Sequence, residues 1–180
     1  MYSVKIISCL FTLMMLSGCG NNLLPSGEDK RPSVLSGTTG AGVSQKAPVF
    51  TVSDTGNNSV TLTNALVGRK GIVLYFTMWC PICDSHMNNM RTAVAPLFPN
   101  VGFYLVDYVS GSVADAAAAA ASNGYSGGVY TTIVDAGQLM LNSYQATMGT
   151  AVVIDSGGTI RMNEDYRDGK NLLSALAALP

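Results

Sequence analysis

Runs of apolar residues and their spacing divide the chain after residue 46 into short strands and helices. The clearest strand is the continuous apolar run 71–76 (GIVLYF), whose β-branched and aromatic residues predict burial on both faces. Residues 81–98 have a helical period instead. Pro81 suits the first helical position, and Pro96 is expected to kink or end the helix. The apolar members of this period define one buried stripe, formed by Cys83, Met87, Met90, Val94 and Leu97.

The remaining pattern completes an alternation of strands and helices. Strands are expected at 48–54, at 101–109, at 131–135 and in a hairpin of 150–155 and 159–163, while 57–66 combines a turn, a short strand and a short helix. Helices are expected at 112–122, at 138–146 and at 171–179. Ser112 is the expected N-cap of the first of these, with Asp115 three residues on. This order predicts an α/β sandwich.

The N-terminus has a different character. Its apolar run, 6–16, has the length of a secretory signal and is too short to span a bilayer comfortably. It closes with LSGC (16–19), which resembles the bacterial lipobox. That resemblance implies a signal peptide over 1–18 and a lipid anchor, including palmitate, on Cys19. The alternative is an ordinary signal peptide that leaves Cys19 as a free thiol.

Between this segment and the predicted domain, residues 20–46 are rich in Gly, Ser, Asn and Pro. Such a composition favours a flexible tether, so the expected organisation is a lipidated cysteine and tether over 19–46 followed by one domain over 47–180. The alternative is that the stretch packs on the domain. The chain carries ten basic and eleven acidic residues, without a basic patch, so no nucleic-acid partner is expected.

The cysteine count draws attention to one pair. Of four cysteines, Cys9 leaves with the predicted signal peptide and Cys19 is the predicted lipid site, which leaves Cys80 and Cys83 in the sequence TMWCPIC. A disulfide between residues so close in sequence closes too small a loop to stabilise the fold much. The spacing after a buried strand, at the start of a helix, places Cys80 where backbone N–H groups and the helix dipole favour a thiolate.

WCPIC in this context resembles the thioredoxin superfamily. Residues 47–83 are similar to the N-terminal half of the membrane-anchored extracytoplasmic thioredoxins, a group that includes cytochrome c maturation reductases, and AVVIDSGGTI (151–160) resembles their late hairpin. The resemblance implies a thioredoxin-like sandwich with a central mixed sheet. It also implies thiol–disulfide exchange with protein thiols or disulfides and with a membrane electron donor or acceptor. No cofactor and no metal are expected.

The chemistry assigns a role to each residue of the motif. Cys80 is the expected nucleophile that forms a mixed disulfide, and Cys83 is the expected resolving thiol. Trp79 and Pro81 flank the exposed sulfur. His86 lies one helical turn after Cys83, where the anchored reductases commonly carry an acidic residue, so it is expected either to exchange a proton with Cys83 or to be a solvated helix residue.

Several positions depart from the family pattern. The buried aspartate of cytoplasmic thioredoxins falls on Leu74, and Asp84 places an anion where the family often has a cation and is expected to oppose thiolate formation. The cis-proline position falls on Gly149, within the predicted substrate-binding loop Met148-Gly149-Thr150. A trans peptide is expected before Gly149, because a cis bond before a non-proline residue costs about 3 kcal/mol.

Other functions remain open at this stage. Two soft thiolates suit Cu(I), and Thr77-Met78-Trp79-Cys80 matches the T-x-x-C of peroxiredoxins, although Val73 stands where a proline normally precedes it. A structural zinc site, a static disulfide and an inactive scaffold are further alternatives. Gly20 after Cys19 predicts the periplasmic face of the outer membrane in a Gram-negative cell; in a Gram-positive cell the lipobox predicts the plasma membrane.

Overall fold

The computed structural model describes residues 35–180, and these contain one mixed sheet of seven strands in the order β2-β1-β5-β4-β3-β6-β7. Strands β3, β4 and β5 run parallel, whereas β1 and β6 pair antiparallel with their central neighbours. The strands are β1 (Thr51–Asp54), β2 (Ser59–Thr61), β3 (Gly71–Thr77), β4 (Val101–Asp107), β5 (Tyr130–Val134), β6 (Thr150–Asp155) and β7 (Ile160–Asp165).

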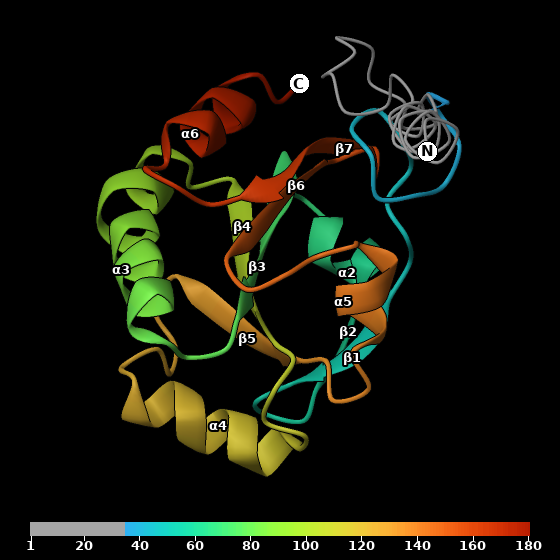
Figure 1. The fold of residues 1–180 in the computed structure, drawn as a ribbon. Coiled ribbons are helices and arrows are strands. Elements are labelled where there is room, and N and C mark those ends of the chain that lie inside the picture. Colours follow the sequence, from blue (N-terminus) through green and yellow to red (C-terminus); the bar gives the residue numbers. More distant parts are fainter. Residues whose placement is uncertain (1–34) are drawn as a thin grey trace, which may run out of the picture. The chain divides into compact units, whose positions relative to one another are not determined.

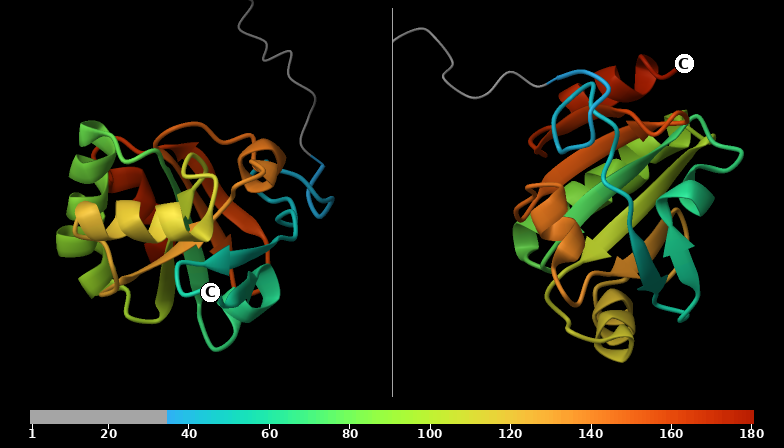
Figure 2. Two further views of the ribbon diagram at one scale, coloured as in Figure 1. Left: turned by 90° about the horizontal axis from the view of Figure 1, so that it is seen from below. Right: turned by 90° about the vertical axis from the view of Figure 1, so that its right-hand side faces the viewer.

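Helices cover both faces of this sheet (Figures 1 and 2). They are α2 (Leu62–Leu66), α3 (Pro81–Asn89), α4 (Val113–Ser122), α5 (Leu139–Ser143) and α6 (Lys170–Ala177). The core on one face joins α3 and α6 to the sheet, and a second core on the opposite face joins α2 and α5. The predicted α/β architecture with a central mixed sheet is confirmed.

The two cores follow from the alternation of side chains along the central strands. In β3, Val73 and Tyr75 belong to the α3 face, while Ile72, Leu74 and Phe76 belong to the opposite face. Every residue of β3 is buried, as the continuous apolar run predicts. The site-bearing end of β3 is therefore fixed from both sides, which positions the start of α3 rigidly.

The helix predicted over 81–98 does not continue to its end. Helix α3 passes at Met90 into a π-helical turn, Met90–Val94, and then into a short 3-10 helix, Ala95–Leu97. Pro96 lacks an N–H and cannot continue the α-helical bonding. As a result Leu97 turns outward and is 65% exposed, so its place in the predicted buried stripe is wrong, whereas the other four members are buried.

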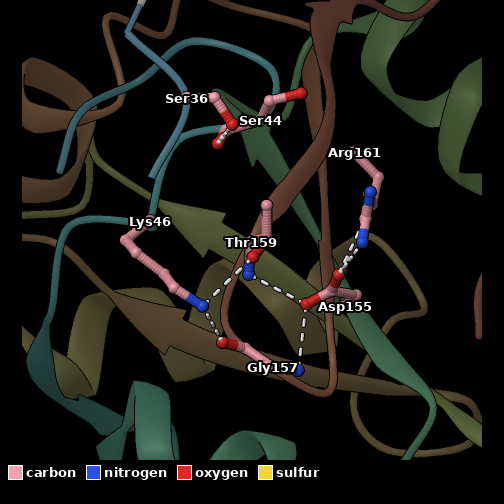
Figure 3. Close-up of polar contacts among 7 residues, drawn as sticks. All are labelled: Ser36, Ser44, Lys46, Asp155, Gly157, Thr159 and Arg161. Atoms are coloured by element: carbon pink, nitrogen blue, oxygen red, sulfur yellow. Dashed lines mark hydrogen bonds and ion pairs between the residues drawn. The ribbon is translucent and has the colours of Figure 1, made fainter. Parts of the chain in front are cut away.

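The flexible tether predicted over 20–46 needs correction for its last residues. Residues 44–47 lie along the β6–β7 hairpin: Ser44 N–H donates to the Ile160 carbonyl, and Ile160 N–H donates to the Gln45 carbonyl, each at 2.9 Å. Lys46 Nζ donates to the Gly157 carbonyl at 2.8 Å (Figure 3). The predicted signal peptide, Cys19 and the tether up to residue 34 lie outside the described residues.

Asp155 holds the turn to which this segment binds (Figure 3). Its carboxylate is 3% exposed and accepts from the backbone N–H groups of Gly157 and Thr159, each at 2.9 Å. It also pairs with Arg161, whose Nε lies at 2.7 Å. Composition predicts a flexible tether here, whereas the contacts that hold residues 44–46 on the domain come from the hairpin, more than a hundred positions away.

Candidate active site

The cysteine pair sits at the junction of β3 and α3, as the sequence predicts. Cys80 is the N-cap of α3, Pro81 is the first helical residue, and Cys83 N–H donates to the Cys80 sulfur at 3.2 Å. The two sulfurs are 2.7 Å apart and both cysteines are free thiols. Cys80 is partly exposed whereas Cys83 is fully buried, so an incoming disulfide meets Cys80 first.

The hydrogen bond between the sulfurs drives their pKa values apart. Burial raises the pKa of Cys80, and the hydrogen bond with Cys83 raises it further. Burial opposes ionisation of Cys83 as well, but hydrogen bonds with Cys80, with the backbone of Met78 and with Thr77 outweigh it and lower the pKa of Cys83. The sequence predicts the lowered pKa at Cys80, but it is the pKa of Cys83 that is lowered, because more hydrogen-bond donors reach the inner sulfur than the outer one.

When the reduced pair loses one proton, the remaining proton is shared between the two sulfurs, since either of them can donate across their contact. Moving that proton across the 2.7 Å contact to Cys83 leaves the thiolate on Cys80, where the N–H of Cys83 receives it. The thiolate then lies on the only sulfur of the pair that is accessible. The proton left on Cys83 has to leave before Cys83 can resolve the mixed disulfide.

Trp79 is held by the buried carboxylate of Asp107, a residue outside the CxxC motif. Its indole Nε1–H donates to Asp107 Oδ2 at 2.8 Å, and its backbone N–H donates to Thr77 Oγ1 at 3.1 Å. Trp79 adopts a left-handed backbone with φ of 59°, which is unfavourable for a side chain with a Cβ. The indole anchor and the Thr77 bond together fix the turn that delivers Cys80 to the helix start.

The side chain of Tyr75 lies between the imidazole of His86 and the buried sulfur of Cys83. The Nδ1 of His86 lies 2.9 Å from the hydroxyl of Tyr75, a residue of β3 that is 1% exposed. The ring of Tyr166 packs on the imidazole with centroids 4.8 Å apart. Burial lowers the pKa of His86, so the imidazole is neutral near pH 7. His86 is thus a half-buried member of the site rather than a solvated helix residue.

Asp84, by contrast, turns away from the sulfurs. Its carboxylate accepts from the Tyr125 hydroxyl at 2.6 Å. The Tyr125 ring in turn packs beside Trp79, with centroids 6.4 Å apart, and under the guanidinium of Arg91 at 4.9 Å. Asp84 therefore holds Tyr125 against Trp79, a contact that could not be predicted from the sequence.

The loop predicted to bind substrate lies across from His86. Every peptide bond in the described part of the chain is trans, including the one before Gly149, and Gly149 has φ of 86°. Its N–H donates to the Phe76 carbonyl at 2.9 Å, and its carbonyl accepts from Tyr166 at 2.8 Å. Thr150 is buried and donates to Asp165 at 3.1 Å, whereas Met148 is 37% exposed. Of the predicted loop, Met148 is the residue that a partner can contact.

Of the predicted site residues, Trp79, Cys80, Pro81, Cys83 and His86 gather at the start of α3, and Gly149 closes on His86. Sequence reasoning missed Tyr75 and Asp107. Both carried a usable indication: Tyr75 shares the sheet face of Val73, which α3 covers, and Asp107 is a polar residue at the carboxyl end of a buried strand beside β3. Two polar hollows, of about 460 and 650 Å³, lie near Tyr166 and Thr150, and neither is lined by a cysteine.

Two further searches of the described residues concern metal ions and membranes. Among residues 35–180, no cluster of three or more His, Cys, Asp or Glu side chains is arranged to hold a metal ion. Within the same residues, no helix combines the length and the apolar character needed to cross a membrane.

Comparison with known proteins places this geometry among redox proteins. The model of the AhpC/TSA family matches residues 43–163. A comparison with the curated proteins found no match. Similar solved structures include a secreted Mycobacterium tuberculosis disulfide oxidoreductase homologous to E. coli DsbE, which is 23% identical with a TM-score of 0.56 over 72% of this chain and 96% of that one.

Two other structures share the same architecture. A thioredoxin-like protein from Aeropyrum pernix is 14% identical, with a TM-score of 0.59 over 72% of this chain and 89% of that one. The peroxidoxin BcpB from Mycobacterium tuberculosis is 18% identical, with a TM-score of 0.57 over 74% of this chain and 93% of that one. At these identities the likeness concerns the fold, and it confirms the predicted thioredoxin-like sandwich.

Proposed function

The chain belongs to the AhpC/TSA family, and we propose that within it the protein is an extracytoplasmic thiol–disulfide oxidoreductase. The observation that carries the proposal is the asymmetry of the pair: Cys80 is partly exposed at the N-terminus of α3, and Cys83 is buried with its sulfur 2.7 Å away. This arrangement suits a nucleophile that a substrate reaches and a resolving thiol that it does not.

The reaction follows in two exchanges. The Cys80 thiolate attacks a substrate disulfide, forms a mixed disulfide and releases one substrate sulfur as a thiolate, which takes a proton from solvent. Cys83 then loses its proton and attacks the Cys80 sulfur, so that the Cys80–Cys83 disulfide forms and the second substrate thiolate leaves. Two electrons pass from the cysteine pair to the substrate, and the reverse sequence oxidises a dithiol.

The substrates are protein thiols and disulfides, which approach over Trp79, Pro81 and Met148. Three exposed apolar side chains support a protein partner: Met78 and Ile82, each two positions from Cys80, and Met148 in the predicted substrate-binding loop, which are 45%, 58% and 37% exposed. A membrane electron donor or acceptor completes the cycle. The lipobox-like LSGC supports a lipid anchor on Cys19, with the periplasmic face of the outer membrane as the location in a Gram-negative cell.

A thiol peroxidase is the alternative within the family, and the position of Thr77 argues against it. Thr77 Oγ1 accepts from Trp79 N–H at 3.1 Å, and the Thr77 side chain lowers the pKa of Cys83, the inner sulfur. The threonine of the T-x-x-C pattern is therefore committed to the buried thiol and not to the exposed one. Consumption of hydrogen peroxide by the reduced protein, compared with its reduction of insulin disulfides, separates the two activities.

The decisive experiment is trapping in the native cell. The Cys83→Ser variant is expected to accumulate mixed disulfides with partner proteins, visible as bands that disappear on reduction, while the matched Cys80→Ser variant accumulates none. Acid-quenched thiol labelling of the wild-type protein then gives the direction: a reduced pair means a reductase, and an oxidised pair means an oxidase. Absence of any trapped partner would contradict the proposal.

The anchor is tested separately, because it does not depend on the redox chemistry. Metabolic labelling with palmitate and membrane fractionation should show a lipidated, membrane-bound wild-type protein. The Cys19→Ala variant should lose both the label and the membrane association. A Cys19→Ala protein that stays bound to the membrane would refute lipidation as the anchor.

A further inference from the structure

The hydroxyl of Tyr75 connects the buried sulfur to the histidine. Tyr75 lies in the middle of β3, and its hydroxyl is 2.9 Å from His86 Nδ1, with the two rings at 87°. The Cys83 sulfur lies close enough to this hydroxyl to raise its pKa, and both residues are buried in the core that α3 shares with the sheet. Tyr75 of β3 therefore lies on a path between two residues of α3, from the fully buried thiol of Cys83 to the half-buried imidazole of His86.

We propose that Tyr75 relays the proton of Cys83 to His86 when the mixed disulfide is resolved. This inference rests on the proposed function, because it assigns a route to a proton that only the resolving step must remove. In that step the Cys83 S–H proton moves to the Tyr75 oxygen, and the Tyr75 O–H proton moves to His86 Nδ1. The Cys83 electron pair forms the bond to Cys80, and the bond from Cys80 to the substrate sulfur breaks.

A relay is needed because Cys83 has no direct contact with water. Its side chain is 0% exposed, and it holds the proton that left Cys80 when the thiolate formed there. Once Cys80 is bound to the substrate it has no proton to donate, so the hydrogen bond that lowered the pKa of Cys83 is lost while burial remains. The proton must therefore leave through the neighbouring side chains.

The protonation states along the path suit this direction. Burial raises the pKa of Tyr75, and the nearby Cys83 raises it further, so the hydroxyl stays protonated and passes a proton on only as it receives one. Burial lowers the pKa of His86 and favours the neutral imidazole, and in the tautomer with the ring proton on Nε2 its Nδ1 accepts from the Tyr75 hydroxyl. The resulting imidazolium returns its proton to solvent, since the ring is half-buried.

No carboxylate hydrogen-bonds this histidine among the described residues. The titratable groups that face it are Tyr75 from β3, Tyr166 from the segment after β7, and Cys83 on its own helix. The Tyr166 hydroxyl is already committed to Asn89 Oδ1 at 2.5 Å. Tyr75 is therefore the tyrosine of this group that hydrogen-bonds the imidazole.

Gly149 leaves the space in which the pair meets. A Cβ atom at this position would lie 3.8 Å from His86 Nδ1 and 3.9 Å from the Tyr75 hydroxyl. These are ordinary van der Waals distances, and Gly149 is itself buried, so its backbone covers the hydrogen bond between Tyr75 and His86.

The test uses an aromatic disulfide, dithiobis-nitrobenzoate, because its coloured thiolate reports each exchange separately. Attack by Cys80 releases the first thiolate, and attack by Cys83 releases the second, so stopped-flow absorbance gives both rates on the full-length reduced protein. Tyr75→Phe and His86→Gln are compared with the wild type. Tyr130→Phe is the matched control, since Tyr130 is also buried and its hydroxyl bonds the Met87 carbonyl of α3 at 2.5 Å, away from the path.

We expect the second release to slow about 100-fold in Tyr75→Phe and in His86→Gln, the lower end of the usual contribution of general acid–base catalysis, while the first changes by less than about 2-fold. The wild-type second release should slow as the pH falls and His86 becomes protonated, and both variants should lose this limb of the profile. The double variant should be no slower than the slower single variant, because the two groups act in series.

The failures of the two proposals are distinguishable. A Tyr75→Phe protein with the wild-type second release and pH profile overturns the relay but leaves the oxidoreductase proposal intact. An equal slowing in Tyr130→Phe also overturns it, because loss of any buried hydroxyl would then suffice. A wild-type protein that never releases the second thiolate overturns the proposed function itself. Should Tyr75→Phe not fold, the half-buried His86→Gln carries the same test.

Discussion

Replacing Asp107 by asparagine tests whether this carboxylate holds the turn before Cys80. Asp107 is 0% exposed, and its Oδ2 accepts from Trp79 Nε1 at 2.8 Å and from Ser110 Oγ at 2.5 Å. Its Oδ1 accepts from the backbone N–H groups of Val109 and Ser110, each at 3.0 Å. The carboxylate thus joins the end of β4 to the only tryptophan of the chain.

The magnitude follows from the acceptors that asparagine retains. The amide oxygen can replace Oδ1 and keep both backbone N–H groups, and the Ser110 hydroxyl can rotate to accept from the amide NH2. The indole N–H of Trp79 then faces a donor and loses its acceptor. A hydrogen bond to a charged group contributes about 1.5–3 kcal/mol, and a buried donor left unpaired costs about 1–3 kcal/mol. We expect the free energy of unfolding to fall by about 3 kcal/mol, since the indole is only half-buried.

The assay is equilibrium unfolding in urea followed by circular dichroism, applied as a double-mutant cycle with Trp79→Phe. Trp79→Phe removes the donor, so Asp107→Asn should cost at least about 1.5 kcal/mol less in that background. Asp115→Asn is the matched control, because Asp115 is an exposed aspartate at a helix start and should change stability little. A coupling energy below about 0.5 kcal/mol would refute the anchoring role of Asp107.

Three further outcomes are expected. Asp155→Ala should lower the free energy of unfolding by about 3 kcal/mol because it removes the charged acceptor of two backbone N–H groups and of Arg161, whereas Lys46→Ala beside it should cost less than about 1 kcal/mol; equal effects in urea titrations would contradict this. Gly149→Ala should cost about 1–2 kcal/mol through the backbone alone, since φ is 86° and the added Cβ meets no clash, and an unchanged urea midpoint would count against it. Burial lowers the folded-state pKa of His86 below its ordinary 6.5, so the unfolded chain binds that proton more readily and stability should fall as the pH drops below about 6.5; His86→Gln should abolish that part of the slope.

The parts of the fold that the sequence predicted are those whose residues interact locally or with the whole core. The apolar run of β3 is recognisable from consecutive residues. The start of α4 depends on residues three positions apart, since Ser112 accepts from Asp115 N–H at 3.1 Å. The segment 35–46 is different, because the hydrogen bonds that hold it on the domain are made to the distant β6–β7 hairpin, in addition to those within the segment. Its Gly- and Ser-rich composition predicts flexibility correctly only where no distant partner supplies those bonds.

The same distinction explains what was found and missed in the site. The motif itself is local, so the positions of Cys80, Pro81 and Cys83 follow from the strand–helix junction. The groups that tune the motif come from further away: Tyr75 reaches His86 across eleven positions, and Asp107 reaches Trp79 across twenty-eight. The first contact depends on how α3 packs on β3, and the second depends on β3 and β4 being neighbours in the sheet.

The charge distribution in the cysteine pair shows why these distant groups matter for function. A helix N-terminus alone predicts a thiolate at Cys80, yet Thr77 and the Met78 backbone lower the pKa of Cys83 instead. The shared proton must therefore cross to Cys83 before attack and leave it before resolution. The first transfer needs only the 2.7 Å contact between the sulfurs, but the second needs an acceptor that reaches a buried atom. Tyr75 and His86 occupy the one place where such an acceptor is required, so the chemistry of this CxxC pair depends as much on β3 as on the helix that carries it.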